Sequence, residues 1–195
     1  MKMIFKIFWI LRGLFYKLFL GKFGLPSYIG KPVFIGNFKR IFIGKKVRIM
    51  PNARIEVIDK NSSIVFEDNI SIAQNLHIIS GGNQELIIGK NTTFSANVFI
   101  TNIDHEYQDI NIHIMEQKLI FSKTQIGENC FIGYGAVIQA GTILGKQCIV
   151  GANAVVRGHF PPYCVIVGVP AKIVKRYDEK SGDWRKTDKY GEFVE

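Results

Sequence analysis

His105 is the residue of this 195-residue chain whose type and surroundings best suit proton transfer near neutral pH. It lies in the segment NIDHEYQ, where a regular pattern of aliphatic residues is interrupted. A histidine on a loop at the edge of a rigid scaffold can take the proton of a hydroxyl group as that group attacks an electrophile. Asp104 or Glu106 is the neighbour available to orient its imidazole. His105 is therefore our candidate catalytic base.

The remaining histidines and the cysteines are weaker candidates for chemistry. His77 lies in the segment NLHIIS and is expected to face outward. His113 is surrounded by isoleucines, which indicates packing within a loop, and His159 falls where the regular pattern ends. Three cysteines without a CxxC spacing exclude a disulfide framework and a cysteine zinc site, and they favour a reducing, cytosolic setting.

A six-residue period defines the elements that must position His105. From residue 126 the chain reads IGENCF, IGYGAV, IQAGTI, LGKQCI, VGANAV and VRGHFP, with an aliphatic residue first in every line and a small residue fifth in the first five. Neither an α-helix nor an ordinary alternating strand has this period. Three hexads form one coil of a triangular parallel β-helix, in which the aliphatic residue points inward and Gly or Asn relaxes the turns. Cys130 and Cys148, which are separated by three whole hexads, should therefore stack in the core of successive coils.

The same period is present less regularly in the first half of the chain. One block runs from Ile43 to Ile55, and a second runs from Ile64 to Ile100 with Gly82 in the inward column. Ile126 follows Ile100 by 26 positions, 20 more than one hexad, which predicts a protruding excursion loop at 104–121. We therefore predict an all-β fold with three parts: an amphipathic basic helix at 1–24, a β-helix at 30–168 that includes this loop, and a C-terminal tail at 169–195.

Positive charge is concentrated at the N-terminus. Residues 1–55 contain twelve Lys or Arg and no acid, whereas the remainder has 13 basic and 16 acidic residues. Lys6, Arg12 and Lys17 interrupt the apolar N-terminal segment, which disfavours a membrane-spanning helix, and no small-residue cleavage site follows it. Residues 1–22 therefore predict peripheral contact with an anionic membrane, with packing on the protein itself or on a neighbouring subunit as the alternative. Binding to nucleic acid is disfavoured, because the basic residues are confined to one end and no known binding module accompanies them.

The hexad repeat, the pair Asp104-His105 on the excursion and the closing segment VGVPAKIVKR together resemble the hexapeptide-repeat acyltransferases. The resemblance is strongest to the maltose, galactoside and polysaccharide O-acetyltransferases, and it covers about residues 40–177. It implies a left-handed parallel β-helix, a homotrimer, and acetyl-CoA in the groove between neighbouring prisms. It also implies that His105 deprotonates the acceptor, which attacks the thioester directly without a metal.

The resemblance implies further site residues. The backbone N–H of Tyr134 falls where the family stabilises the oxyanion, and Ala152 and Arg157 fall along the pantetheine arm. Lys172 and Lys175 fall where basic residues meet the nucleotide phosphates of CoA. The residues implied to contact the glycan acceptor are Gln74, Asn75 and His77.

The predicted function is an acetyl-CoA-dependent O-acetyltransferase that modifies a sugar hydroxyl of a surface polysaccharide or its precursor. The predicted location is the cytoplasm, at the inner face of the cytoplasmic membrane. An N-acetyltransferase of a nucleotide-linked amino sugar and a non-catalytic scaffold stay open as alternatives. A zinc enzyme resembling the β-helical carbonic anhydrases is disfavoured, because His77 and His105 are not separated by a whole number of three-hexad coils and so would not converge as ligands.

Overall fold

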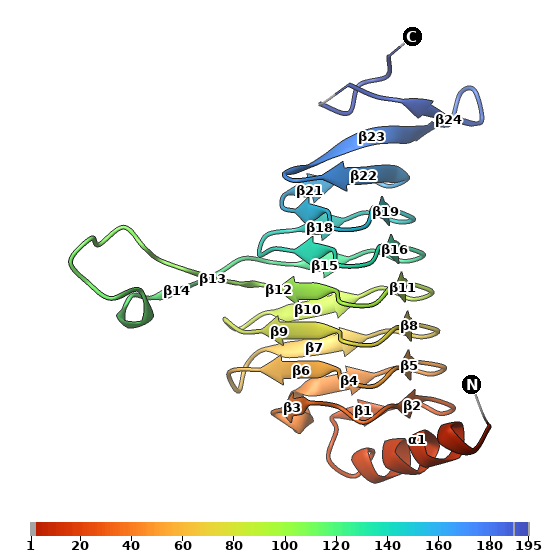
Figure 1. Cartoon of the computed structure of the whole chain (residues 1–195), viewed down its shortest axis with the longest axis vertical. Coiled ribbons are helices and arrows are strands. Elements are labelled where there is room, and N and C mark those ends of the chain that lie inside the picture. Colours follow the sequence, from red (N-terminus) through yellow and green to blue (C-terminus); the bar gives the residue numbers. More distant parts are fainter. Residues whose placement is uncertain (1–2, 189, 195) are drawn as a thin grey trace.

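Short parallel strands stack in three columns and form the three faces of a triangular prism (Figure 1). The computed structural model describes residues 3–188 and 190–194, with side chains from Ile7 onward, so Met1 and Lys2 of the predicted N-terminal helix lie outside the described residues. Sheet A consists of β1 (Lys22–Phe23), β4 (Ile41–Ile43), β7 (Ser63–Phe66), β10 (Glu85–Ile88), β15 (Gln125–Ile126), β18 (Ile143–Leu144) and β21 (His159–Phe160).

Sheets B and C form the other two faces. Sheet B consists of β2 (Tyr28–Ile29), β5 (Arg48–Ile49), β8 (Ser71–Ile72), β11 (Thr93–Phe94), β16 (Phe131–Ile132), β19 (Ile149–Val150), β22 (Cys164–Gly168), β23 (Ala171–Asp178) and β24 (Asp183–Lys186). Sheet C consists of β3 (Phe34–Gly36), β6 (Arg54–Val57), β9 (His77–Ser80), β12 (Phe99–Thr101), β17 (Val137–Ile138) and β20 (Val155–Val156). A short 3-10 helix, η1 (Phe38–Arg40), precedes β4.

The strand register confirms the period predicted from the hexads. Ile126 pairs with Leu144 and Ile138 pairs with Val156, in each case the residue three hexads further along the chain. Ile100 pairs with Ile138, which is the partner expected when one coil of three hexads is lengthened by the predicted insertion. All five side chains are buried. Each such aliphatic side chain stabilises the fold by about 1.5–3 kcal/mol, so the inward ladders form the core.

The earlier coils are longer than three hexads, and Gly82 shows why. Ile78 pairs with Ile100, which lies further along the chain than three hexads would place its partner, because extra residues widen the corner between β9 and β10. Gly82 lies in that corner with φ of +77°. The expectation that Gly82 belongs to an inward column is therefore wrong: the longer corner shifts the period at this point.

The glycines at the second position of the hexads are required by close approach between coils. A Cβ atom on Gly133 would lie 2.6 Å from the backbone nitrogen of Ala152 in the next coil. Left-handed backbone angles occur instead at residues such as Asn129 and Asn153, with φ of 57° and 56°. Asn adopts this region more readily than most residues with a side chain. Asn therefore turns the chain, while these glycines allow the coils to stack.

The predicted core residues Cys130 and Cys148 stack in successive coils, and Cys164 extends their column. All three are free and buried, and the strands β16, β19 and β22, at which they lie, pair in register. The neighbouring Cys148, together with burial, raises the pKa of the Cys130 thiol. A buried neutral thiol is a small core residue, as the fifth position of the hexad requires.

Both ends of the prism are covered by other elements (Figure 1). The helix α1 (Met3–Tyr16) lies across the N-terminal end, where Gly13 is buried against the ring of Phe23 and the rings of Trp9 and Tyr28 are 5.8 Å apart. At the other end β23 and β24 pair antiparallel beyond β22, so the C-terminal tail extends sheet B by two strands. Such covers protect the exposed ends of a solenoid core from water.

Candidate active site on sheet C

A hairpin leaves the prism after β12 (Figure 1). Residues of this hairpin and of sheet C line a pocket between them. The hairpin consists of the antiparallel strands β13 (Ile103–His105) and β14 (Leu119–Phe121), with the 3-10 helix η2 (Ile114–Glu116) in the connecting loop. The predicted excursion loop is thus a hairpin whose first strand ends at the candidate base. The pocket has a volume of about 510 Å³, and its lining includes Ile79, Phe99 and Val137 from sheet C and His105, Met115 and Leu119 from the hairpin.

Backbone pairing holds His105 in this pocket. It lies opposite Leu119 in the hairpin register, and its backbone N–H donates to Oδ1 of Asp104 at 3.0 Å. The imidazole Nδ1 is buried and has no hydrogen-bond partner among the described residues. Neither Asp104 nor Glu106 therefore orients the ring through Nδ1. Because a buried polar atom is normally satisfied, this nitrogen is available to a group that the single chain does not supply.

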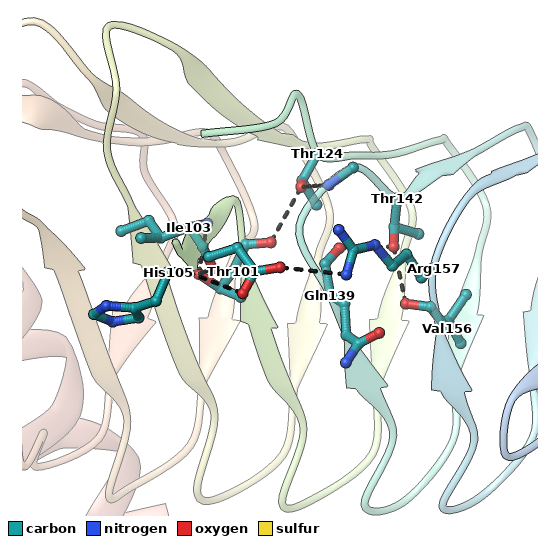
Figure 2. Close-up of polar contacts among 10 residues, drawn as sticks. Thr101, Ile103, His105, Thr124, Gln139, Thr142, Val156 and Arg157 are labelled. Carbon is teal, nitrogen blue, oxygen red and sulfur yellow. Dashed lines mark hydrogen bonds and ion pairs between the residues drawn. The ribbon is translucent and has the colours of Figure 1, made fainter. Parts of the chain in front are cut away.

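Arg157 is joined to the strand that contains His105. Its Nη1 lies 3.2 Å from Oδ2 of Asp104, and Figure 2 shows the Arg157 side chain near Gln139 and directed toward Thr101. Arg157 follows β20, two strands further along sheet C than β12, so the ion pair ties the hairpin to a later coil. The family resemblance implies a place for Arg157 along the pantetheine arm, whereas its described ionic partner is Asp104.

Tyr134, Ala152 and Asn75 lie together at the edge where the chain enters the strands of sheet C. Asn75 donates from Nδ2 to Oδ1 of Asn97 at 2.7 Å, and Asn97 in turn donates to the Tyr134 hydroxyl. Gln74 is exposed beside Asn75, and Ala152 is exposed in the turn of the following coil. The structure thus brings most of the implied acceptor and pantetheine residues to one edge. Asn75 also links two successive coils there through its hydrogen bond to Asn97.

The candidate site residues of one chain are divided between two edges of sheet C. Tyr134 precedes the strand β17, and Gln139 follows it and lines the His105 pocket. Tyr134 therefore lies at the entry edge of the sheet and His105 at the exit edge. A single chain does not bring the candidate base and the candidate oxyanion donor together.

His77 lies on the outer face of sheet C, between these two edges. Its ring meets Phe99 edge to face with centroids 5.1 Å apart, and its Nε2 is buried without a partner among the described residues. Burial lowers the pKa of His77, the charge of Arg54 lowers it further, and Glu56 opposes the change. His77 is consequently neutral at pH 7.

Lys172 and Lys175 lie on β23, near the C-terminal end of the prism. They are exposed and stand opposite Val167 and Val165 of β22. In the part of the chain that the structure describes, neither forms an ion pair with a carboxylate. Their ammonium groups are free to neutralise an anionic ligand.

Sequence reasoning missed the apolar half of the pocket. Phe99 and Val137 each precede an inward aliphatic residue, and so point out of the prism at positions where a solvated face would have polar residues. That alternation was the available signal. Gln139 was missed because its place in the pocket depends on the hairpin, which the six-residue period does not position.

Two observations concern metals and membranes. Among the described residues, no group of three His, Cys, Asp or Glu side chains is placed to hold a metal ion. Within the same residues, no helix combines the length and the hydropathy that a membrane crossing requires, α1 being 14 residues long.

Comparison with known proteins agrees with this architecture. Residues 123–158 match the bacterial transferase hexapeptide family (six repeats). An Escherichia coli protein, WbbJ, named for O-acetyl transfer in lipopolysaccharide biosynthesis, is 33% identical over 110 residues, which are 53% of this chain and 56% of that protein. A Mycobacterium tuberculosis protein named as an acetyltransferase is 32% identical over 91 residues, which are 47% of this chain and 30% of that protein. The chain therefore spans about half, or less, of the length of these relatives.

Solved structures share the fold over most of the chain. AntD, an N-acyltransferase from Bacillus cereus crystallised with dTDP and coenzyme A, superimposes with a TM-score of 0.71 at 18% identity, covering 86% of this chain and 90% of that one. A hexapeptide-repeat acetyltransferase from Vibrio cholerae gives 0.58 at 20% identity, covering 87% and 81%. The fold is the parallel β-helix that the hexads predict, with the left-handed winding that the family resemblance implies. The chain is thus similar to hexapeptide-repeat transferases, in sequence over residues 123–158 and in fold over most of its length.

Proposed function

We propose that this protein is an acetyl-CoA-dependent O-acetyltransferase that acts on a sugar hydroxyl of a surface polysaccharide or its precursor. The observation that carries the proposal is the position of His105, at the end of a paired strand, in a pocket, with an unsatisfied Nδ1. The match of residues 123–158 to the hexapeptide transferase family and the naming of the 33% identical relative WbbJ for O-acetyl transfer support it.

In the proposed reaction His105 acts as general base. Its imidazole takes the proton of the acceptor hydroxyl as the oxygen attacks the thioester carbonyl carbon. The C–S bond then breaks, and the leaving thiolate takes the proton from the imidazolium. The backbone N–H of Tyr134 would donate to the oxyanion, and Lys172 and Lys175 would meet the phosphates of CoA.

The division of the site between two edges of sheet C supports a homotrimer. Because Tyr134 and His105 of one chain lie at opposite edges, a donor that contacts both needs two neighbouring chains. In the proposed trimer the Tyr134 and Ala152 edge of one protomer faces the His105 edge of the next. Acetyl-CoA then lies between prisms, and Gln74, Asn75 and His77 face the glycan from sheet C.

An amino sugar is the second acceptor class to consider. AntD, which is an N-acyltransferase, shares this fold, but at 18% identity the likeness shows the fold alone. His105 would serve an amine as well as a hydroxyl, since either nucleophile must lose a proton. The named O-acetyl relative at 33% identity favours the hydroxyl.

The proposal also places the trimer in the cytoplasm, at the inner face of the cytoplasmic membrane. The described part of α1 and the turn after it expose apolar side chains to solvent, Leu18 at 77% among them. An apolar helix face beside basic residues suits the interface of an anionic bilayer.

Thiol release from acetyl-CoA tests the activity, with a panel of glycan hydroxyl acceptors and one nucleotide-linked amino sugar. His105→Ala should lower kcat by about 10²- to 10⁴-fold, the usual contribution of a general base. His159→Ala, an exposed histidine on sheet A, is the matched control and should leave kcat unchanged. A loss of less than about tenfold in His105→Ala would count against the general-base role, and turnover with the amino sugar alone would replace O-transfer with N-transfer.

A further inference from the structure

The outer face of α1 is an apolar surface that acyl transfer does not use. The helix packs on the prism through Gly13 and Trp9, which leaves the opposite side in solvent. Five large side chains of α1 and the turn after it are more than half exposed, and they are Ile7, Phe8, Leu11, Phe15 and Leu18. Contiguous exposed apolar side chains usually mark a contact with a partner or a membrane.

A groove continues this surface onto the first coils of the prism. It has a volume of about 650 Å³, and its lining combines apolar residues with the polar Ser27 and Asn69 and with two cations. Ile10 and Leu14 belong both to the groove and to the exposed side of α1, so the two surfaces are continuous. The two cations are Lys46, in the corner before β5, and Arg48, the first residue of β5.

Positive charge surrounds this end of the molecule. Residues 1–55 contain no acidic residue, and the exposed lysines of α1 and the first coils include Lys17, Lys22, Lys31, Lys39 and Lys45. Among the described residues, none of these lysines, nor Lys46 or Arg48, forms an ion pair. One carboxylate reaches the corner from the next coil, where Asp68 accepts a hydrogen bond from the backbone N–H of Lys45. The field at this end is therefore positive.

We propose that the apolar face of α1, the groove, Lys46 and Arg48 together bind an anionic phospholipid in a membrane. An acyl chain enters the groove, and the phosphate meets the two cations. A second copy of the chain is the poorer occupant, because it would bring a second basic end against the first. The inference rests on the membrane contact proposed above and extends it beyond residues 1–22 to a headgroup site on the prism.

The position of α1 then fixes how the enzyme stands on the bilayer. The helix lies across the end of the prism (Figure 1). When it inserts into the membrane, the long axis of the prism is therefore perpendicular to the membrane plane. In the proposed trimer with parallel axes, three such sites face the same bilayer. Weak individual contacts then act together, which strengthens binding without any new contact.

Sedimentation of the full chain with vesicles tests the site. Phosphatidylcholine vesicles are compared with vesicles that also contain phosphatidylglycerol, and binding should be stronger to the anionic vesicles. The variant Lys46→Asn/Arg48→Gln should bind the anionic vesicles at least about tenfold more weakly, since each basic contact is worth about fivefold. Asn suits position 46, where φ is 57°, because Asn69 and Asn91 occupy the corresponding turns of the next coils with φ of 58° and 61°.

Matched variants separate this site from general charge and general hydrophobicity. Lys180→Gln/Lys186→Gln removes the same charge from exposed lysines at the opposite end and should bind like the unmodified protein. Leu11→Gln/Phe15→Gln should lose binding to both kinds of vesicle, whereas Ile110→Gln/Ile112→Gln, exposed on the hairpin loop, should not.

Three results would overturn the inference. They are an equal loss of binding in the two charge-removing variants, no preference for phosphatidylglycerol, and a lower oligomer mass of Leu11→Gln/Phe15→Gln, which would mean that a second copy covers the face. Thiol release with a soluble acceptor reports the proposed activity separately. Normal vesicle binding without thiol release would contradict the activity alone, and normal thiol release without vesicle binding would contradict the lipid site alone.

Discussion

Asp104 and Arg157 show how the neighbourhood of the candidate base is organised at the level of single residues. Asp104 accepts from the backbone N–H of His105 through one oxygen and pairs with Arg157 through the other. Both side chains are about half exposed, so the ion pair contributes less than about 1 kcal/mol to stability. Its effect is positional, because it joins the strand that ends at His105 to a coil two strands away.

His77 should make the stability of the protein fall in mild acid. The folded protein holds the pKa of His77 below the ordinary value of 6.5, chiefly by burial and also through Arg54. As pH falls through about 6.5, the unfolded chain therefore binds a proton that the folded chain does not, so stability is lost toward low pH. His77→Gln should show a smaller loss of unfolding free energy between pH 7.5 and pH 5.5, measured with urea at one fixed protein concentration.

The exposed His159 provides the comparison for that measurement. His159→Gln should leave the pH dependence of the unfolding free energy as it is in the unmodified protein, because this residue is exposed on sheet A. An unchanged pH dependence in His77→Gln would mean that the protonation of His77 is not coupled to folding.

Residue by residue, the sequence predicted the parts of the candidate site that depend on chain order. His105 could be found because it interrupts the period, and the family resemblance supplied Tyr134 and Ala152. The partner of Arg157 could not be found in this way, since Asp104 lies far earlier in the chain and the insertion separates the two residues from any common register. Side-chain pairing between a hairpin and a distant coil depends on the direction in which the hairpin leaves the prism.

At the level of elements, the coil stacking depends on glycines such as Gly133. Gly133→Ala would bring a Cβ atom within 2.6 Å of the Ala152 nitrogen, a backbone atom that cannot move without separating the coils. We expect a loss of about 1–3 kcal/mol in unfolding free energy, as for other overpacked positions. Gly141→Asn is the control, because φ there is +85°, which Asn tolerates, and the nearest atom is 3.5 Å from the added Cβ.

A urea unfolding midpoint that is lower for Gly133→Ala than for Gly141→Asn is the expected result. Equal midpoints would show that the second position of the hexad selects glycine for a reason other than coil spacing.

The period predicted the elements well where the hexads are regular. Each inward aliphatic residue from Ile126 to Val156 falls in the expected column, because a coil of three hexads leaves no freedom in register. The corner around Gly82 departs from the period, since extra residues at a corner change the coil length without changing the inward ladder. The sequence also left open what α1 packs against. A helix with Lys, Gly13 and aromatic residues on one face can lie on a membrane or on a protein surface.

At the scale of the molecule, the proposed membrane contact and the proposed acyl-transfer site lie at different heights along the long axis of the prism. α1 covers the N-terminal end, while His105 follows β12, three strands beyond β3 in sheet C. Three strand spacings are about 14 Å, and the helix adds about 10 Å below them. The acceptor hydroxyl would thus be modified about 25 Å above the outer face of α1. Such a height suits a sugar that several other groups separate from its lipid anchor.

Complementation between two inactive variants tests whether the active site forms between chains. His105→Ala removes the base at one edge of sheet C, and Ala152→Trp fills the exposed turn at the other edge with a ring. Each variant alone should lack activity, because every interface of its trimer has one defective edge. In mixed trimers an interface is intact when the chain that contributes the His105 edge has His105 and the chain that contributes the facing edge has Ala152. With equal amounts of the two variants each condition holds for about half of the chains, so about a quarter of the interfaces are intact. Co-refolding should therefore restore about a quarter of the thiol release, whereas a site formed within one chain would restore none.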